Sequence, residues 1–181
     1  FNFEELRREL VTDFQFKTSS DTEVLYRLLE KWGRQGLRRL NGMFAFGYYD
    51  RTQKKLLLVR DRFGIKPLYF FHDHRGLIFS SEQKAIYPFI EEGIDKRALV
   101  EYLSFKCVSG QRTLVSGVSE LNPGHWLELD VVTNRMFVER WYEMPRERDQ
   151  VTPDLVESTE YLLEDAVRLR LISDVPVGLQ L

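Results

Sequence analysis

Three kinds of side chain in this sequence could take part in chemistry: a carboxylate, a thiol and an imidazole. Asp21 stands at the start of a predicted helix, where a carboxylate most often caps the helix by accepting backbone N–H groups. Cys107 is the only cysteine, but no histidine or asparagine is arranged near it, which favours a structural role. His72, His74 and His125 lie in or beside predicted turns without the further ligands that a metal needs, so we expect no metal site.

A second group of polar residues belongs to the run RDRFGIKPLY, residues 60–69. Arg60 and Asp61 end a predicted strand, and the turn that follows needs Gly64 for unusual dihedral angles and Pro67 to fix φ. These residue types favour a structural role for Arg60 and Asp61. The alternative is that the two residues also help to orient a ligand-binding site.

The elements that position these residues are helical before residue 41. Apolar residues spaced by three and four predict two helices, with an alternating segment between them. Asn2 is the expected cap of the first helix, and Ser20 or Asp21 is the expected cap of the second. The predicted helices are residues 3–10 and 19–33, and the alternating segment, residues 13–16, predicts a short strand.

After residue 41 the apolar pattern changes to a period of two, which indicates strands. The connecting turns are too short for parallel crossovers, so the first four strands predict an antiparallel meander. These strands are residues 43–50, 55–61, 67–73 and 76–82, with more strands within 113–130 and 134–143. Helices are predicted over residues 83–89, 96–105 and 153–171, a polar linker over 143–153, and an extended, buried segment over 174–181.

The composition argues against several classes of function. The net charge is −2, and lysine and arginine are spread along the chain, which argues against nucleic acid as the main partner. No apolar run approaches the ~20 residues of a membrane span, so we expect no membrane partner. A single cysteine allows no internal disulfide, and together these features predict a cytoplasmic protein.

Three stretches carry a family resemblance: LNGMFAFGYYD (40–50), RDRFGIKPLY (60–69) and FSSEQKAI (79–86). With SDTE (20–23), they resemble the glutamine-hydrolysing asparagine synthetases, whose amino-terminal half is a class II glutamine amidotransferase domain. The resemblance implies an α+β fold, a four-layer αββα sandwich of antiparallel sheets of the amino-terminal-nucleophile hydrolase type. The first helix and strand of an α/β synthetase domain would follow it.

The resemblance also implies how the chain is divided. Residues 1–146 match the glutamine amidotransferase domain without its amino-terminal part, and residues 151–181 match the beginning of an ATP-dependent synthetase domain. The nucleophilic cysteine and the oxyanion-hole residues of the family would precede Phe1. We therefore expect no catalytic residue in this chain, and we expect the chain alone to be inactive.

Two residues match positions that bind ligands in the family. Asp21 matches the aspartate that binds the α-ammonium of the substrate glutamine, a pairing that rejects ligands without the positive charge. Glu23 is expected to support the helix instead. Leu181 matches a position that contacts the adenine nucleotide through its backbone or an apolar contact.

The implied activity is that of a glutamine-dependent carbon–nitrogen ligase. Glutamine hydrolysis would supply ammonia, and ATP with Mg²⁺ would activate aspartate or a related carboxylate acceptor as an acyl-adenylate. A homodimer is compatible with this assignment.

Three alternatives remain open at this point. A different amidotransferase could contain the domain, but the FGIKPLY run and the VPVG segment (175–178) argue against it. A member of the same family could act on another carboxylate, or the chain could be a non-catalytic amidotransferase-like binding domain.

Overall fold

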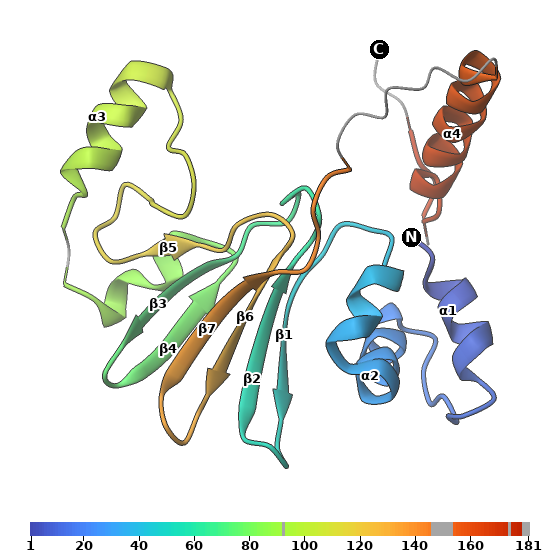
Figure 1. Ribbon diagram of the computed structural model, residues 1–181, viewed down its shortest axis with the longest axis horizontal. Helices are drawn as coiled ribbons and strands as arrows, with labels where there is room; N and C mark the ends of the chain where they lie inside the picture. The colour runs from blue at the N-terminus through green and yellow to red at the C-terminus, as the bar shows by residue number, and fades with distance from the viewer. Residues whose placement is uncertain (92, 146–153, 174, 179–181) are drawn as a thin grey trace. The chain divides into compact units, whose positions relative to one another are not determined.

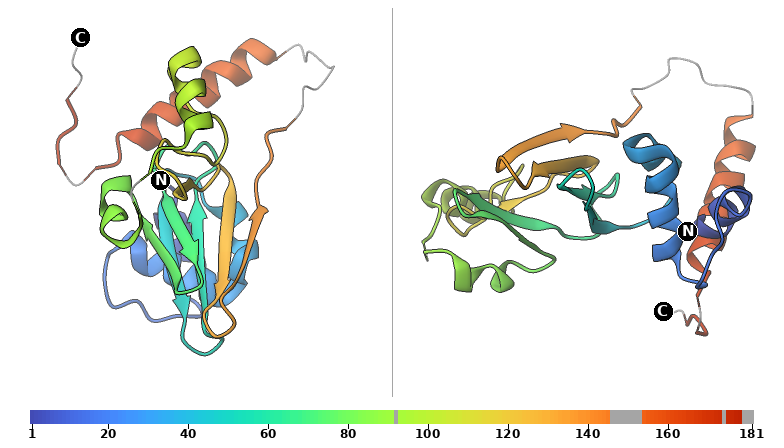
Figure 2. Two further views of the ribbon diagram at one scale, coloured as in Figure 1. Left: turned by 90° about the vertical axis from the view of Figure 1, so that its left-hand side faces the viewer. Right: turned by 90° about the horizontal axis from the view of Figure 1, so that it is seen from below.

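A computed structural model describes residues 1–91, 93–145, 154–173 and 175–178 of the chain. The chain divides into two units, Phe1–Gly42 together with Met144–Leu181, and Met43–Glu143. Helices make up the regular structure of the first unit, and antiparallel sheets dominate the second (Figures 1 and 2). These findings confirm the expected α+β class with antiparallel sheets.

The first unit contains two amphipathic helices, α1 (Phe3–Leu10) and α2 (Asp21–Trp32), followed by the 3-10 helix η1 (Gly33–Arg39). The two α-helices pack against each other. α2 ends at Gly33, whose φ of 54° lies in the left-handed region that glycine tolerates best, as its position in the sequence predicts. The buried apolar side chains of these elements are Leu6, Leu10, Val24, Leu28, Leu29 and Leu37.

Asn2 precedes α1, but its side chain does not cap the helix. Its Nδ2 donates to the Arg39 carbonyl at 3.0 Å, and its Oδ1 accepts from the Asn41 N–H at 3.0 Å. The prediction of a cap was wrong because a donor and an acceptor at the end of η1 together satisfy both halves of the amide. This pair of hydrogen bonds ties the start of α1 to the end of η1.

Residues 13–16, predicted as a strand, form a turn and an irregular loop between α1 and α2. The alternation in the sequence comes from two aromatic residues that lie under guanidinium groups. Arg27 Cζ is 5.1 Å from the centre of the Phe14 ring, and Arg7 Cζ is 4.6 Å from that of Phe16. The strand prediction was wrong because, in the described part of the chain, no strand pairs with this segment.

The strands of the second unit are β1 (Ala45–Asp50), β2 (Lys55–Arg60), β3 (Tyr69–Asp73), β4 (Gly76–Ser80), β5 (Ser119–Glu120), β6 (His125–Asp130) and β7 (Arg135–Arg140). They form a four-stranded sheet of order β1–β2–β6–β7 and a three-stranded sheet of order β4–β3–β5, and all pairs are antiparallel. The hairpins β1–β2 and β3–β4 confirm the predicted turns. The prediction of one meander was wrong, because β2 pairs with β6 and β3 begins the second sheet.

Leucine and phenylalanine side chains form a core between the two sheets. Leu58 of β2 and Leu127 of β6 belong to the same buried cluster as Phe70 of β3. Each such side chain contributes on the order of 1.5–3 kcal/mol when it leaves water. The two sheets are thus held together by apolar burial, as a sandwich requires. The remaining buried members of the cluster are Leu68, Leu121 and Leu129.

Two short 3-10 helices, η2 (Gln83–Ala85) and η3 (Tyr87–Phe89), replace the single helix predicted over residues 83–89. Pro88 lacks the N–H group that a continuous α-helix needs there. α3 (Lys96–Phe105) agrees with its prediction residue for residue. It begins at Asp95, whose carboxylate accepts from the Arg97 N–H at 2.9 Å and from the Ala98 N–H at 3.1 Å.

α4 (Leu155–Arg170) confirms the helix predicted over residues 153–171. Most of the predicted linker, residues 146–153, lies outside the described residues. For residues 175–178 the prediction of a buried segment is wrong, since Val175 and Val177 are 68% and 55% exposed, and the rest of that segment, residues 174 and 179–181, lies outside the described residues. Among the described residues, no helix has the length and apolarity needed to cross a membrane.

Candidate functional site

Asp21 is the first residue of α2, and its side chain is exposed. Ser20, rather than Asp21, is the N-cap, because its hydroxyl oxygen accepts a hydrogen bond from the Thr22 N–H at 3.1 Å. The Asp21 Oδ1 receives two long contacts, from the hydroxyl groups of Ser20 at 3.5 Å and Thr22 at 3.4 Å. The carboxylate is therefore not needed for capping, and it lies at the positive end of the helix dipole.

Glu23 holds the loop that leads to Asp21. Its Oε1 accepts from the Lys17 N–H at 2.9 Å, and its Oε2 accepts from the Thr18 N–H and the Thr18 hydroxyl, both at 2.7 Å. Ser20 and Glu23 have the spacing of a capping box, yet the Ser20 N–H donates to the Thr18 Oγ1 at 3.2 Å instead. The expected role of Glu23 in supporting the helix was incomplete, because its hydrogen bonds fix the loop before the helix.

These hydrogen bonds predict an acid-dependent contribution of Glu23. The Thr18 hydroxyl and the Lys17 N–H lower the pKa of Glu23 from its ordinary value of 4.5 to about 2. Because the folded-state pKa lies below the unfolded one, the stabilisation is complete above pH 4.5 and is lost as the pH falls toward 2.

Nuclear magnetic resonance of the Glu23 carboxyl carbon should therefore give a titration midpoint near pH 2. Thr18→Val, which removes the strongest cause, should move the midpoint upward. A wild-type midpoint at the ordinary value would contradict the hydrogen bonds.

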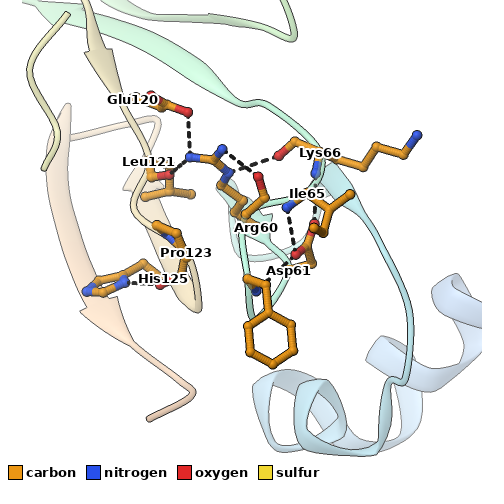
Figure 3. A network of polar contacts seen from close by, with 10 residues as sticks. Arg60, Asp61, Ile65, Lys66, Glu120, Leu121, Pro123 and His125 are labelled. Carbon is orange, nitrogen blue, oxygen red and sulfur yellow. Dashed lines mark hydrogen bonds and ion pairs between the residues drawn. The ribbon is translucent and has the colours of Figure 1, made fainter. Parts of the chain in front are cut away.

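Arg60 and Asp61 form a buried polar network at the end of β2 (Figure 3). Only 6% of Arg60 and 1% of Asp61 is exposed. Backbone donors compensate the buried carboxylate, as the cost of burying an unpaired charge requires. The Asp61 carboxylate accepts hydrogen bonds of 3.0–3.2 Å from the N–H groups of Phe44, Phe63, Ile65 and Lys66.

The Arg60 guanidinium reaches in a different direction (Figure 3). It donates to the carbonyls of Gly64 at 2.8 Å, Lys66 at 2.9 Å and Leu121 at 2.6 Å. Its Nη1 also lies 2.7 Å from Glu120 Oε1. Glu120 belongs to β5, so this arginine joins the end of one sheet to a strand of the other, which supports the structural interpretation of the motif.

The loop 62–66 owes its shape to these two charged residues and to Gly64. Gly64 has a φ of +66°, and a Cβ built on it would lie 2.8 Å from Pro123 Cγ and 3.0 Å from Arg60 Cζ. The positive φ confirms the expected need for glycine, and the close approach of Pro123 and Arg60 is a second reason that the sequence did not predict. Phe63 and Ile65 are 59% and 57% exposed, so the loop directs its apolar side chains outward.

Two of the histidines have structural contacts. His72 Nε2 lies 3.1 Å from Asn134 Oδ1, and His125 Nδ1 lies 2.8 Å from the Pro123 carbonyl. Cys107 is exposed. Within the described ranges, no group of histidine, cysteine, aspartate and glutamate side chains is placed to hold a metal ion.

The predicted site residues are distributed over both units of the chain. Asp21 belongs to the first unit and the Arg60–Asp61 pair to the second. Leu181, the predicted nucleotide contact, lies outside the described residues. Sequence reasoning missed the loop contacts of Glu23 and the ion pair of Glu120, and no local pattern gave a signal for either.

Comparisons with known proteins identify the family of the chain. A family model described as a glutamine amidotransferase domain matches residues 1–142. Asparagine synthetase [glutamine-hydrolyzing] 2 of Bacillus subtilis (strain 168) is 35% identical, over 99% of this chain and 26% of its own length. A putative asparagine synthetase [glutamine-hydrolyzing] of Mycobacterium tuberculosis (strain ATCC 25618 / H37Rv) is also 35% identical, over 98% of this chain and 29% of its own. The chain thus spans between a quarter and a third of these relatives.

A solved structure supports the fold. The glutamine phosphoribosylpyrophosphate amidotransferase from B. subtilis, complexed with ADP and GMP, has a TM-score of 0.52 at 22% identity, covering 78% of this chain and 27% of that one. This likeness concerns the fold alone. The family match, in contrast, extends over residues 1–142 of the 181, and on that ground the chain belongs to the glutamine amidotransferase domain family.

Proposed function

We propose that this chain is the amidotransferase part of a glutamine-hydrolysing asparagine synthetase, in which Asp21 binds the α-ammonium group of glutamine. The observation that carries the assignment of Asp21 is its position at the start of α2 with the cap already provided by Ser20. A carboxylate that the helix does not need as its cap is available to pair with the ammonium group of a ligand. The family match and the asparagine synthetase relatives support the reaction.

The remaining roles in the reaction are assigned to two domains by the family resemblance. Residues 1–146 are the amidotransferase domain, in a four-layer αββα arrangement, and residues 151–181 begin the synthetase domain, where Leu181 contacts the nucleotide. ATP with Mg²⁺ supplies the activation of aspartate there. The enzyme works in the cytoplasm, with a homodimer as its candidate assembly.

The test uses the complete gene product that contains this chain. It should release glutamate from glutamine and, with ATP, Mg²⁺ and aspartate, form asparagine with either glutamine or ammonia as the nitrogen source. Glutamate release together with no aspartate-dependent use of ATP would overturn the synthetase assignment while leaving the amidotransferase family intact. Omitting aspartate and offering other carboxylates distinguishes the acceptor.

A further inference from the structure

The loop 17–20, directly before Asp21, is held from two sides by side chains of opposite charge. On the side of α2, the Glu23 carboxylate takes the N–H groups of Lys17 and Thr18 and the hydroxyl of Thr18, all between 2.7 and 3.1 Å. A carboxylate is acceptor-only, so it binds the donors of the loop.

The other side of the loop is held by Arg7 of α1. Its Nη1 donates to the Thr18 carbonyl at 2.7 Å, and its Nη2 donates to the Ser20 carbonyl at 3.2 Å. The guanidinium also lies over the Phe16 ring. A guanidinium is donor-only, so it binds the acceptors that the carboxylate leaves.

Thr18 connects these contacts to the residue before Asp21. Its hydroxyl donates to Glu23 Oε2 at 2.7 Å and accepts from the Ser20 N–H at 3.2 Å. The N–H and the carbonyl of Ser20 are therefore both fixed, the first through Thr18 and the second by Arg7. The Ser20 hydroxyl already caps α2, so the helix does not need Arg7 and Glu23 for its start. Their hydrogen bonds fix the backbone of the loop before Asp21 instead.

We propose that Arg7, Thr18 and Glu23 form a loop clamp that positions the Asp21 carboxylate for the ammonium group of the substrate. This inference rests on the proposed role of Asp21. The three residues are positioning residues, because they act through the backbone of Ser20 and not on the substrate. A binding carboxylate that is displaced by about 1 Å loses much of its effect, by factors of up to about a hundred.

The decisive comparison is between Thr18→Val and Thr18→Ser in the complete gene product. Valine removes the hydroxyl that connects Glu23 to Ser20, and serine keeps it. Thr18→Val is expected to raise the KM for glutamine about tenfold or more, with kcat for ammonia-dependent synthesis unchanged. Thr18→Ser is expected to restore the KM for glutamine to within a factor of about two of wild type.

Glu23→Gln tests the charged side of the clamp, and Glu30→Gln is its matched control. Glu30 is on the same helix, is exposed, and pairs with Arg27 at 2.7 Å, so the same chemical change is made away from the loop. Glu23→Gln should raise the KM for glutamine, and Glu30→Gln should not. Ammonia-dependent activity reports that the synthetase part of each variant is intact, and a thermal unfolding transition at the wild-type temperature reports that the amidotransferase part is folded.

The result of Asp21→Asn distinguishes the two proposals. If Asp21→Asn raises the KM for glutamine and Thr18→Val and Glu23→Gln do not, the clamp is overturned while the role of Asp21 stands. If Asp21→Asn leaves glutamine kinetics unchanged, the role of Asp21 fails and the clamp fails with it. A higher KM in all three variants, with rescue by Thr18→Ser, supports both.

Discussion

Asp61→Ala is expected to lower the free energy of unfolding of this chain by about 3–5 kcal/mol, because each buried donor left without an acceptor costs about 1–3 kcal/mol. The substitution leaves four backbone N–H groups of the Asp61 cluster without their acceptor, in a place where only 1% of the side chain is exposed. The lost hydrogen bonds involve Phe44, just before β1, and the loop 62–66, which connects β2 of one sheet to β3 of the other. The substitution should therefore destabilise both sheets at these ends.

Urea unfolding followed by tryptophan fluorescence measures this loss directly. Trp141 is 8% exposed, and its Nε1 donates to the Arg60 carbonyl at 3.1 Å, so its emission reports on the same network. Asp61→Asn should have an intermediate effect of about 1–3 kcal/mol, because one oxygen remains as an acceptor while the amide NH₂ faces donors.

Asp50→Ala is the matched control for this experiment. The Asp50 carboxylate also accepts backbone N–H groups, those of Thr52 at 2.8 Å and Gln53 at 2.9 Å, but it does so in the partly exposed β1–β2 turn. Water can replace its contacts, so its loss should be clearly smaller than that of Asp61. Equal losses for Asp50→Ala and Asp61→Ala would contradict the central role of the buried network.

Local patterns in the sequence predicted those elements whose signals lie within a few residues. The cap of α2, the spacing of α2 and α3, and the turns of the β1–β2 and β3–β4 hairpins are of this kind. The division of the strands into two sheets could not be predicted in this way. It depends on β2 pairing with β6 and on Arg60 reaching Glu120, contacts between residues far apart in the chain.

The candidate site was predictable to a similar extent. The position of Asp21 at a helix start followed from the SDTE stretch, and the structural character of Gly64 followed from its place in a turn. The function of Glu23 did not follow, because a glutamate in the first turn of a helix satisfies several local patterns equally well. Only the path of the loop before the helix decides which N–H groups it binds.

Asp21→Asn is expected to raise the KM for glutamine of the complete gene product about 10- to 100-fold, the equivalent of one charge-assisted hydrogen bond. Asparagine keeps the shape of the side chain but loses the negative charge that pairs with an ammonium group. Synthesis from ammonia should continue at the wild-type rate, since ammonia bypasses the glutamine site. The measurement is steady-state kinetics with each nitrogen source, at saturating ATP and aspartate.

The fold makes this variant a clean test. The cap of α2 is the Ser20 hydroxyl, and the Asp21 carboxylate has only long contacts of 3.4 and 3.5 Å to neighbouring hydroxyl groups, so helix stability should change little. Asp13→Asn is the control. Asp13 is exposed, lies in the same unit, pairs with Lys31 at 2.5 Å and is not part of the loop 17–20. Unchanged glutamine kinetics in Asp21→Asn, or an equal rise in Asp13→Asn, would remove Asp21 from the glutamine site. A selective rise in Asp21→Asn would mean that the carboxylate at the start of α2 recognises the substrate, because no capping role remains to explain it.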